Sequence, residues 1–184
     1  MITNYKATGD WFYILPAIAL VDFVVILLAK YPSATPLFAV DSLNAWYDAF
    51  GIAAVAADIF SIAIGIAAAR YIFGALGLKG LLPFLVVLVG FQLAHDLFFY
   101  TAVIKPMPKG HNKMIDIFKS YGTENGAKIL VSDALMMLAS VFIASGLKGL
   151  PAHVTTAVTL VTIYGICYAI YTRDPLPAKI APKA

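Results

Sequence analysis

Five ionisable side chains lie inside long apolar stretches of the sequence, where an uncompensated charge is costly. They are Asp22, Asp58, His95, Asp96 and Asp133. Carboxylates brought together in an apolar environment cannot all be ionised, so they share a proton or bind a cation. These residue types therefore point to a proton or cation site, provided that the elements carrying them meet.

The composition of the chain predicts that the elements carrying these side chains are membrane-spanning helices. The chain has 184 residues, of which 61% are hydrophobic and only 12% charged, and its mean hydropathy is +0.87. Soluble domains are about half apolar and about a quarter charged, so this balance predicts an integral membrane protein. Five stretches have about the 20 residues that a helix needs to cross about 30 Å of hydrocarbon. They are Trp11–Ala29, Gly51–Phe73, Leu81–Val103, Ala127–Leu147 and Leu150–Tyr171.

We therefore expect an all-α, polytopic membrane helix bundle with about five transmembrane helices. Residues 1–172 are expected to form a single transmembrane domain. The Pro- and Lys-rich segment 173–184, "RDPLPAKIAPKA", is expected to be a flexible C-terminal tail.

The pentapeptide "GLKGL" occurs twice, at Gly77–Leu81 and at Gly146–Leu150. Each copy closes one apolar stretch and opens the next. A glycine can end a helix in the left-handed conformation, and proline is tolerated in the first turn of the following helix. Both copies are expected to be tight turns on the same side of the membrane. Convergent turn chemistry and duplication of a helical hairpin both remain open as origins.

Five spans then place the two termini on opposite sides. Four basic residues fall on the side of the GLKGL turns: Lys6, Arg70, Lys79 and Lys148. Nine fall on the other side: Lys30, Lys105, Lys109, Lys113, Lys119, Lys128, Arg173, Lys179 and Lys183. By the positive-inside rule, the N-terminus is expected to be non-cytoplasmic and the C-terminus cytoplasmic.

The acids are expected at similar depths. At about 1.5 Å per residue from the side of the GLKGL turns, Asp22 lies at about 18 Å, Asp133 at about 20 Å, Asp96 at about 22 Å and Asp58 at about 28 Å. All four fall in the half of the membrane nearer the cytoplasm. Polar residues at helical spacing share a face with three of them and are expected to support the site: Ser61 with Asp58, Gln92 and Tyr100 with Asp96, and Ser140 with Asp133.

Three functions follow from this pattern. The first is a proton or cation channel or transporter that uses the buried acids, with Asp22 and His95 as helpers. The second is a structural or assembly protein of a viral or organelle membrane, in which each acid only bonds to a neighbouring helix. The third is a metal-dependent membrane enzyme acting on lipids, with a divalent cation such as Mn²⁺, Mg²⁺ or Zn²⁺ on the four acids and His95. No metal-binding motif supports the third function, no catalytic motif supports an enzyme, and no other cofactor is indicated.

The loop Lys105–Gly126 is expected to contain a short interfacial helix. Met114, Ile115, Phe118 and Tyr121 form an apolar face, whereas Lys113, Asp116 and Lys119 form a charged one. Such a helix suits the surface of the lipid bilayer. Docking of a protein partner, including a second copy of the chain, is the alternative, and nothing in the sequence suggests nucleic-acid binding. Trp46 and Tyr47, which follow the first loop, are expected at the membrane interface.

One long run carries a resemblance. "LAHDLFFYTAVIKPMPKGHNKMIDIFKSYGTENGAKILVSDALMML" (Leu93–Leu138) resembles uncharacterised polytopic membrane proteins of large nucleocytoplasmic DNA viruses of algae and protists. The resemblance extends back to "WYDAFGIAAVAADIFSIAIG" (Trp46–Gly65), so it covers about half of the chain. It implies a viral product in a virion membrane or a host internal membrane, and it implies no catalytic residues.

Overall fold

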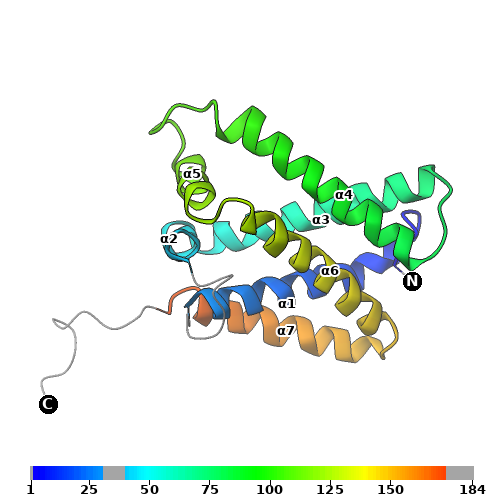
Figure 1. Ribbon diagram of the computed structural model, residues 1–184. Coiled ribbons are helices and arrows are strands. Elements are labelled where there is room, and N and C mark those ends of the chain that lie inside the picture. Colours follow the sequence, from blue (N-terminus) through cyan, green and yellow to red (C-terminus); the bar gives the residue numbers. More distant parts are fainter. Residues whose placement is uncertain (1, 31–39, 173–184) are drawn as a thin grey trace, which may run out of the picture.

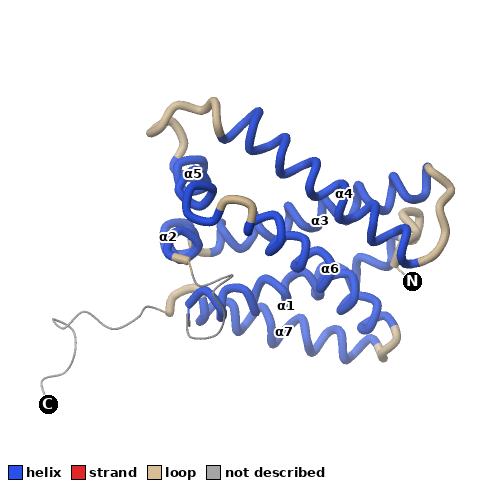
Figure 2. Tube along the Cα trace, viewed as in Figure 1, coloured by secondary structure: helices blue, strands red, loops and turns tan. Residues whose placement is uncertain are grey.

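The computed structural model describes residues 2–30 and 40–172, so the predicted tail 173–184 lies outside the described residues. Within these ranges the chain forms helices and no strands, as predicted (Figures 1 and 2). The α-helices are α1 (Trp11–Lys30), α2 (Asp41–Phe50), α3 (Ile52–Ala75), α4 (Leu81–Phe99), α5 (Lys113–Asn125), α6 (Lys128–Lys148) and α7 (Ala152–Ala169). A 3₁₀ turn at Thr8–Asp10 precedes α1, and the π-helical segment η2 (Tyr100–Ile104) continues α4.

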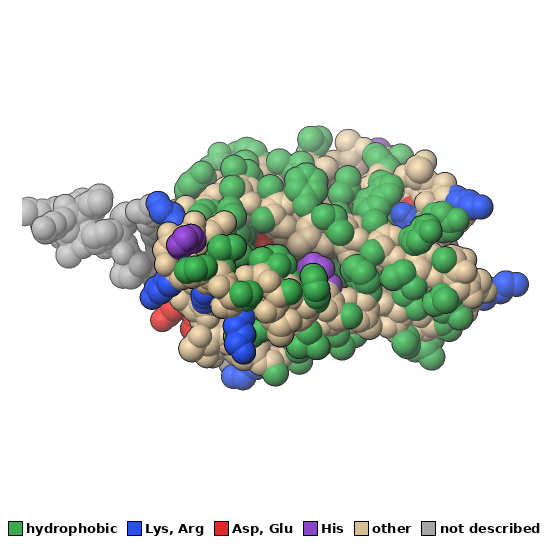
Figure 3. Space-filling model, turned by 90° about the horizontal axis from the view of Figure 1, so that it is seen from above, with side chains coloured by type: hydrophobic (Ala, Val, Ile, Leu, Met, Phe, Trp, Pro, Cys, Tyr) green, Lys and Arg blue, Asp and Glu red, His purple; other side chains and the backbone are tan. Residues whose placement is uncertain are grey.

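Five helical segments of the described chain are long and apolar enough to cross a membrane. They are Thr8–Lys30, Ile52–Ala75, Leu81–Ile104, Lys128–Lys148 and Ala152–Ala169. Their bounds agree within a few residues with the five stretches expected from the sequence. The space-filling view shows hydrophobic side chains along the middle of one face and Lys or Arg at its two ends, as expected for a multipass membrane protein (Figure 3).

Helix α1 is the centre of the bundle. It packs against α3, α6 and α7, whereas α4 packs on the outside against α3 and α6. Within their most apolar windows, 56% of the first span is buried but only 17% of the α4–η2 span. Gly165 of α7 allows the close approach to α1, because a Cβ at this position would lie 2.7 Å from the ring of Phe23.

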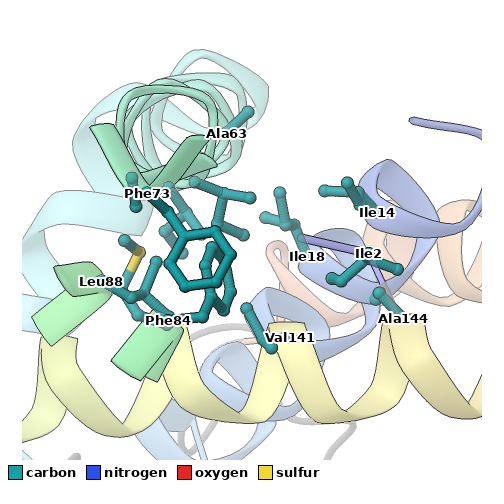
Figure 4. Packing of buried hydrophobic residues seen from close by; sticks show 14 of the residues in the cluster. Ile2, Ile14, Ile18, Ala63, Phe73, Phe84, Leu88, Val141 and Ala144 are labelled. Atoms are coloured by element: carbon teal, nitrogen blue, oxygen red, sulfur yellow. The ribbon is translucent and has the colours of Figure 1, made fainter. Parts of the chain in front are cut away.

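A compact apolar core fills the half of the bundle nearer the two GLKGL turns. Ile14, Phe73, Phe84, Leu88 and Val141 come from four different helices and are buried there (Figure 4). The rings of Phe73 and Phe84 meet edge to face, with centroids 5.4 Å apart. Lipid is as apolar as these side chains, so close packing rather than removal from water holds the spans together here.

The two GLKGL copies are both tight turns between neighbouring spans, but their conformations differ. In the first copy Gly77 has φ of 63°, as expected for a glycine that ends a helix, and Gly80, the N-cap of α4, has φ of 93°. In the second copy α6 continues to Lys148, and Gly149 has φ of −83°. The expectation of a left-handed glycine was therefore wrong for the second copy.

Two short helices lie across the other end of the bundle. Figure 1 shows α2 and α5 nearly end-on beside each other, while the five spans run across the view. Gly51, with φ of 51°, turns the chain from α2 into α3. Asn112 caps α5 by accepting hydrogen bonds from the backbone N–H groups of Met114 and Ile115.

Helix α5 is the amphipathic helix predicted in the 105–126 loop, but its apolar face is covered from within the protein. Ile115 is buried, and the ring of Phe118 lies 4.8 Å from that of Trp46 in α2, measured between centroids. Trp46 and Tyr47 are themselves buried within the protein, at 3% and 1% exposure, and their expected position at the membrane interface stays a prediction. Their surroundings explain the burial, because each indole or phenol group finds a carboxylate inside the bundle.

Candidate functional site

A cavity of about 710 Å³ lies beneath α2 and α5, between α3, α4 and α6. Four of the five predicted site residues line it: Asp58 of α3, His95 and Asp96 of α4, and Asp133 of α6. Three separate spans therefore bring carboxyl groups to one space. The cavity ends at about the level of Gly65, Phe91 and Met137, beyond which the apolar core fills the bundle.

On α4, three polar side chains act as one group. Gln92 Nε2 donates to Asp96, and His95 Nδ1 lies 3.0 Å from the other carboxylate oxygen of Asp96. The imidazole stacks between Phe91 and Phe99, at centroid distances of 6.2 and 5.9 Å. These contacts fix the orientation of Asp96, although adjacent residues on a helix do not normally face the same direction.

Asp58 receives a donor from outside its own helix. The indole N–H of Trp46 donates to Asp58 Oδ2 at 3.0 Å, so α2 positions this carboxylate from above. This hydrogen bond connects the short helix α2 to the membrane-spanning helix α3, and the indole of Trp46 is buried where it forms.

Asp22 lies outside the cavity. It is fully buried on α1, and its Oδ1 accepts a hydrogen bond of 3.2 Å from the hydroxyl of Tyr47. Tyr47 also interacts with Asp58, so the phenol stands between the two acids. Asp22 does not line the cavity itself, and it lies beside Tyr47 and Asp58, which do.

Two phenols of the covering helices stay protonated beside these acids. Burial, followed by the charges of Asp58 and Asp22, raises the pKa of Tyr47 well above its usual value of 10.0. Burial, followed by the charge of Asp133, raises the pKa of Tyr121 on α5 to about 12. Together with the indole of Trp46, α2 and α5 present O–H and N–H donors to a set of carboxylates.

Of the four predicted supporting residues, three line the cavity and one does not. Gln92 and Tyr100 line the cavity, and so does Ser61, although its hydroxyl donates to the backbone carbonyl of Asp58 at 2.9 Å rather than to the carboxylate. Ser140 lies outside the cavity, fully buried, and donates to the carbonyl of Met136 at 2.8 Å. Ser140 therefore satisfies its own helix and takes no part in the site.

One ion pair and one set of hydrogen bonds hold α2 and α5 over the cavity. Lys30, buried at the end of α1, pairs with Asp48 of α2. Glu124 of α5 accepts hydrogen bonds from the backbone N–H groups of Asp41 and Ser42 at 3.1 and 3.0 Å, and from the Ser42 hydroxyl. The Ser42 hydroxyl bond is the main reason that the pKa of Glu124 is lowered. A carboxylate at the start of α2 also complements the helix dipole.

The opposite end of the bundle holds a separate charged cluster. Asp10 pairs with Arg70 of α3 at 3.1 Å and with Lys148 of α6 at 2.6 Å. Arg70 is buried, and it also donates to the carbonyls of Asn4 and Ala7. Both cations were assigned to the side of the GLKGL turns, and there they fasten the N-terminal segment. The carboxylate of Asp10 is therefore paired with two cations.

The third predicted function, a metal-dependent enzyme, gains no support from the geometry. Across residues 2–30 and 40–172, no three His, Cys, Asp or Glu side chains come close enough together to hold a metal ion. The four titratable groups line a wide space rather than converging on a point. Comparison with protein-family models, curated proteins and solved structures found no match to this chain.

Proposed function

We propose that this multipass membrane protein binds a proton or small cation at Asp58, Asp96 and Asp133 and moves it across the membrane. The observation that carries the proposal is the meeting of three carboxyl groups, from three separate spans, on one cavity. A bundle that used its acids only as fasteners would pair each with a donor and leave no common space. Here Asp58 and Asp96 have donors, but both also face the cavity together with Asp133.

In this proposal the cavity is a half-channel. It reaches from α2 and α5 to about the middle of the spans, where Phe84, Leu88 and Val141 close the way. Passage requires an opening of this apolar plug. The α4–η2 span is the least buried of the five, with 17% of its most apolar window buried, and α4 carries both Asp96 and part of the plug. The excess of lysines on the α2–α5 side supports a half-channel whose mouth faces the cytoplasm.

Flux in liposomes tests the proposal. Purified protein is reconstituted, a membrane potential is imposed with a potassium gradient and valinomycin, and proton entry is followed with a trapped pH-sensitive dye; sodium entry is measured in parallel. We expect Asp58→Asn and Asp96→Asn to lower the flux by about tenfold or more, because a hydrogen bond to a charged group contributes about 1.5–3 kcal/mol.

Asp41→Asn is the matched control, since it makes the same change of charge at the same end of the protein on an exposed side chain outside the cavity. It should keep the wild-type rate. Each variant is first shown to elute as the wild type does in size-exclusion chromatography. Wild-type liposomes that pass protons and sodium no faster than empty ones would overturn the proposal and favour a structural or assembly protein.

A further inference from the structure

The cavity is much larger than a bare ion needs. Small-molecule sites commonly measure about 300–1,000 Å³, and this cavity measures about 710 Å³. No three potential metal ligands in the described chain converge within it. A monatomic cation entering this space would keep most of its water. The dimensions fit an organic molecule better.

A buried acceptor without a partner points into the same space. Gln92 is 5% exposed and lines the cavity, and its Oε1 has no hydrogen-bond partner among the described residues. Its Nε2 faces the carboxylate of Asp96, which fixes the amide orientation because two oxygens would repel each other. Leaving a buried acceptor unpaired costs about 1–3 kcal/mol. A ligand with an N–H donor would remove that cost.

The aromatic residues that line the cavity indicate a second property of the ligand. Aromatic rings of Phe91, Phe99, Tyr100 and Phe118 line the cavity together with the carboxyl groups. Aromatic faces attract cations as well as apolar groups, and the attraction grows when water is excluded. The site therefore offers acceptors and negative charge at one place and flat apolar surfaces around it.

We infer that the cavity binds an organic ammonium, a protonated amine with an apolar or aromatic group attached. Its N–H groups face Gln92 Oε1 and the carboxylate of Asp96, and its apolar part lies between the aromatic rings. This inference rests on the proposed function in one respect, namely that the carboxyl groups of the cavity are a cation site. Beyond that function, it specifies that the cation is an organic ammonium rather than a metal ion.

Binding can be followed through Trp46, which lines the cavity. The chain has two tryptophans, so Trp11→Phe leaves Trp46 as the sole indole reporter. The Trp11→Phe protein in lipid nanodiscs is titrated with phenethylamine, with phenethyl alcohol and with phenethyl-trimethylammonium. Phenethylamine should change the fluorescence saturably. The alcohol, which has no charge, and the quaternary ammonium, which has no N–H, should each bind about tenfold more weakly or worse, since each loses a charge-assisted hydrogen bond of about 1.5–3 kcal/mol.

Gln92→Leu should weaken phenethylamine binding to a similar extent and leave the quaternary ammonium unchanged, whereas Asp41→Asn should change neither. Equal binding of the amine and the alcohol would overturn the inference and indicate an apolar or lipid ligand. Equal binding of the two ammonium compounds would overturn the role of Gln92 Oε1. The outcome is separate from the flux experiment: proton flux without amine binding overturns this inference alone, and amine binding without proton or sodium flux overturns the proposed ion transport alone.

Discussion

Tyr47→Phe probes the link between the covering helices and the buried acids. The substitution keeps the ring, which is 1% exposed, and removes the hydroxyl that donates to Asp22 Oδ1 at 3.2 Å. Within the described chain, Asp22 Oδ2 already lacks a hydrogen-bond partner. The variant therefore leaves a fully buried carboxyl group with no donor from the protein.

The cost follows from that burial. Leaving a buried polar group unpaired costs about 1–3 kcal/mol, and more if the group is charged. A loss of about 2 kcal/mol in a chain of this size corresponds to a fall of about 4–8 °C in Tm. Thermal denaturation in detergent, followed as the loss of the folded peak in size-exclusion chromatography, measures this shift.

Tyr13→Phe is the matched control. Its ring is partly buried against the apolar core, and its hydroxyl makes no hydrogen bond within the described residues. Its Tm should stay close to that of the wild type. In an Asp22→Leu background, Tyr47→Phe should cost much less than in the wild type, because the acceptor is gone. If Tyr47→Phe and Tyr13→Phe melt together, the hydroxyl does not hold Asp22 and the reasoning fails.

Two further predictions concern the packing of the spans and the attachment of α2. Gly165→Ala should destabilise the fold by about 1–3 kcal/mol, because the new Cβ would lie 2.7, 3.0 and 3.3 Å from three ring atoms of Phe23. Gly90→Ala, which meets nothing within 4 Å, should be neutral or slightly stabilising, and equal Tm values for the two variants would refute the contact. Because the pKa of Glu124 is lowered in the folded state, its stabilising effect is complete above the ordinary value of 4.5 and is lost as the pH falls through the lowered value. The Tm of Glu124→Gln should therefore lie below that of the wild type near neutral pH, and the two should converge in acid; a difference that is independent of pH would contradict this assignment.

The spans and the depth of the acids could be predicted from the sequence because both follow from local rules. A run of about 20 apolar residues defines a membrane helix, and the rise per residue then gives the depth of Asp96 or Asp133. Such reasoning also placed Gln92 and Tyr100 on the face of Asp96, and both line the cavity with it.

Contacts between elements distant in sequence could not be obtained in this way. Helix α2 follows the first loop, and nothing in its own residues shows that Trp46 donates to Asp58 and Tyr47 to Asp22. Aromatic residues beside a span usually indicate the membrane interface, and that general preference does not show which side chains they contact inside the protein. The sequence therefore did not predict the two hydrogen bonds that connect α2 to the buried acids, Trp46 to Asp58 and Tyr47 to Asp22.

Depth alone also cannot separate an acid that lines a cavity from one that is packed between helices. Asp22 and Asp133 have similar expected depths, yet only Asp133 lines the cavity, because Asp22 is fully buried beside Tyr47. Similarly, Ser140 shares a stripe with Asp133 but lies about two turns away, where α6 is packed in the apolar core.

The central claim is that the carboxyl groups face a space that water enters from the α2–α5 side, and cysteine labelling tests it most directly. Ser61 and Phe60 are neighbours on α3, at nearly the same depth and both exposed, but only Ser61 lines the cavity. In a Cys167→Ser background, Ser61→Cys and Phe60→Cys in proteoliposomes are treated with a water-soluble methanethiosulfonate reagent from each side. Only the thiolate reacts, so a thiol in contact with lipid is inert. The account predicts fast labelling of Ser61→Cys from the α2–α5 side and slow labelling of Phe60→Cys from either side; equal rates for the two variants would contradict it.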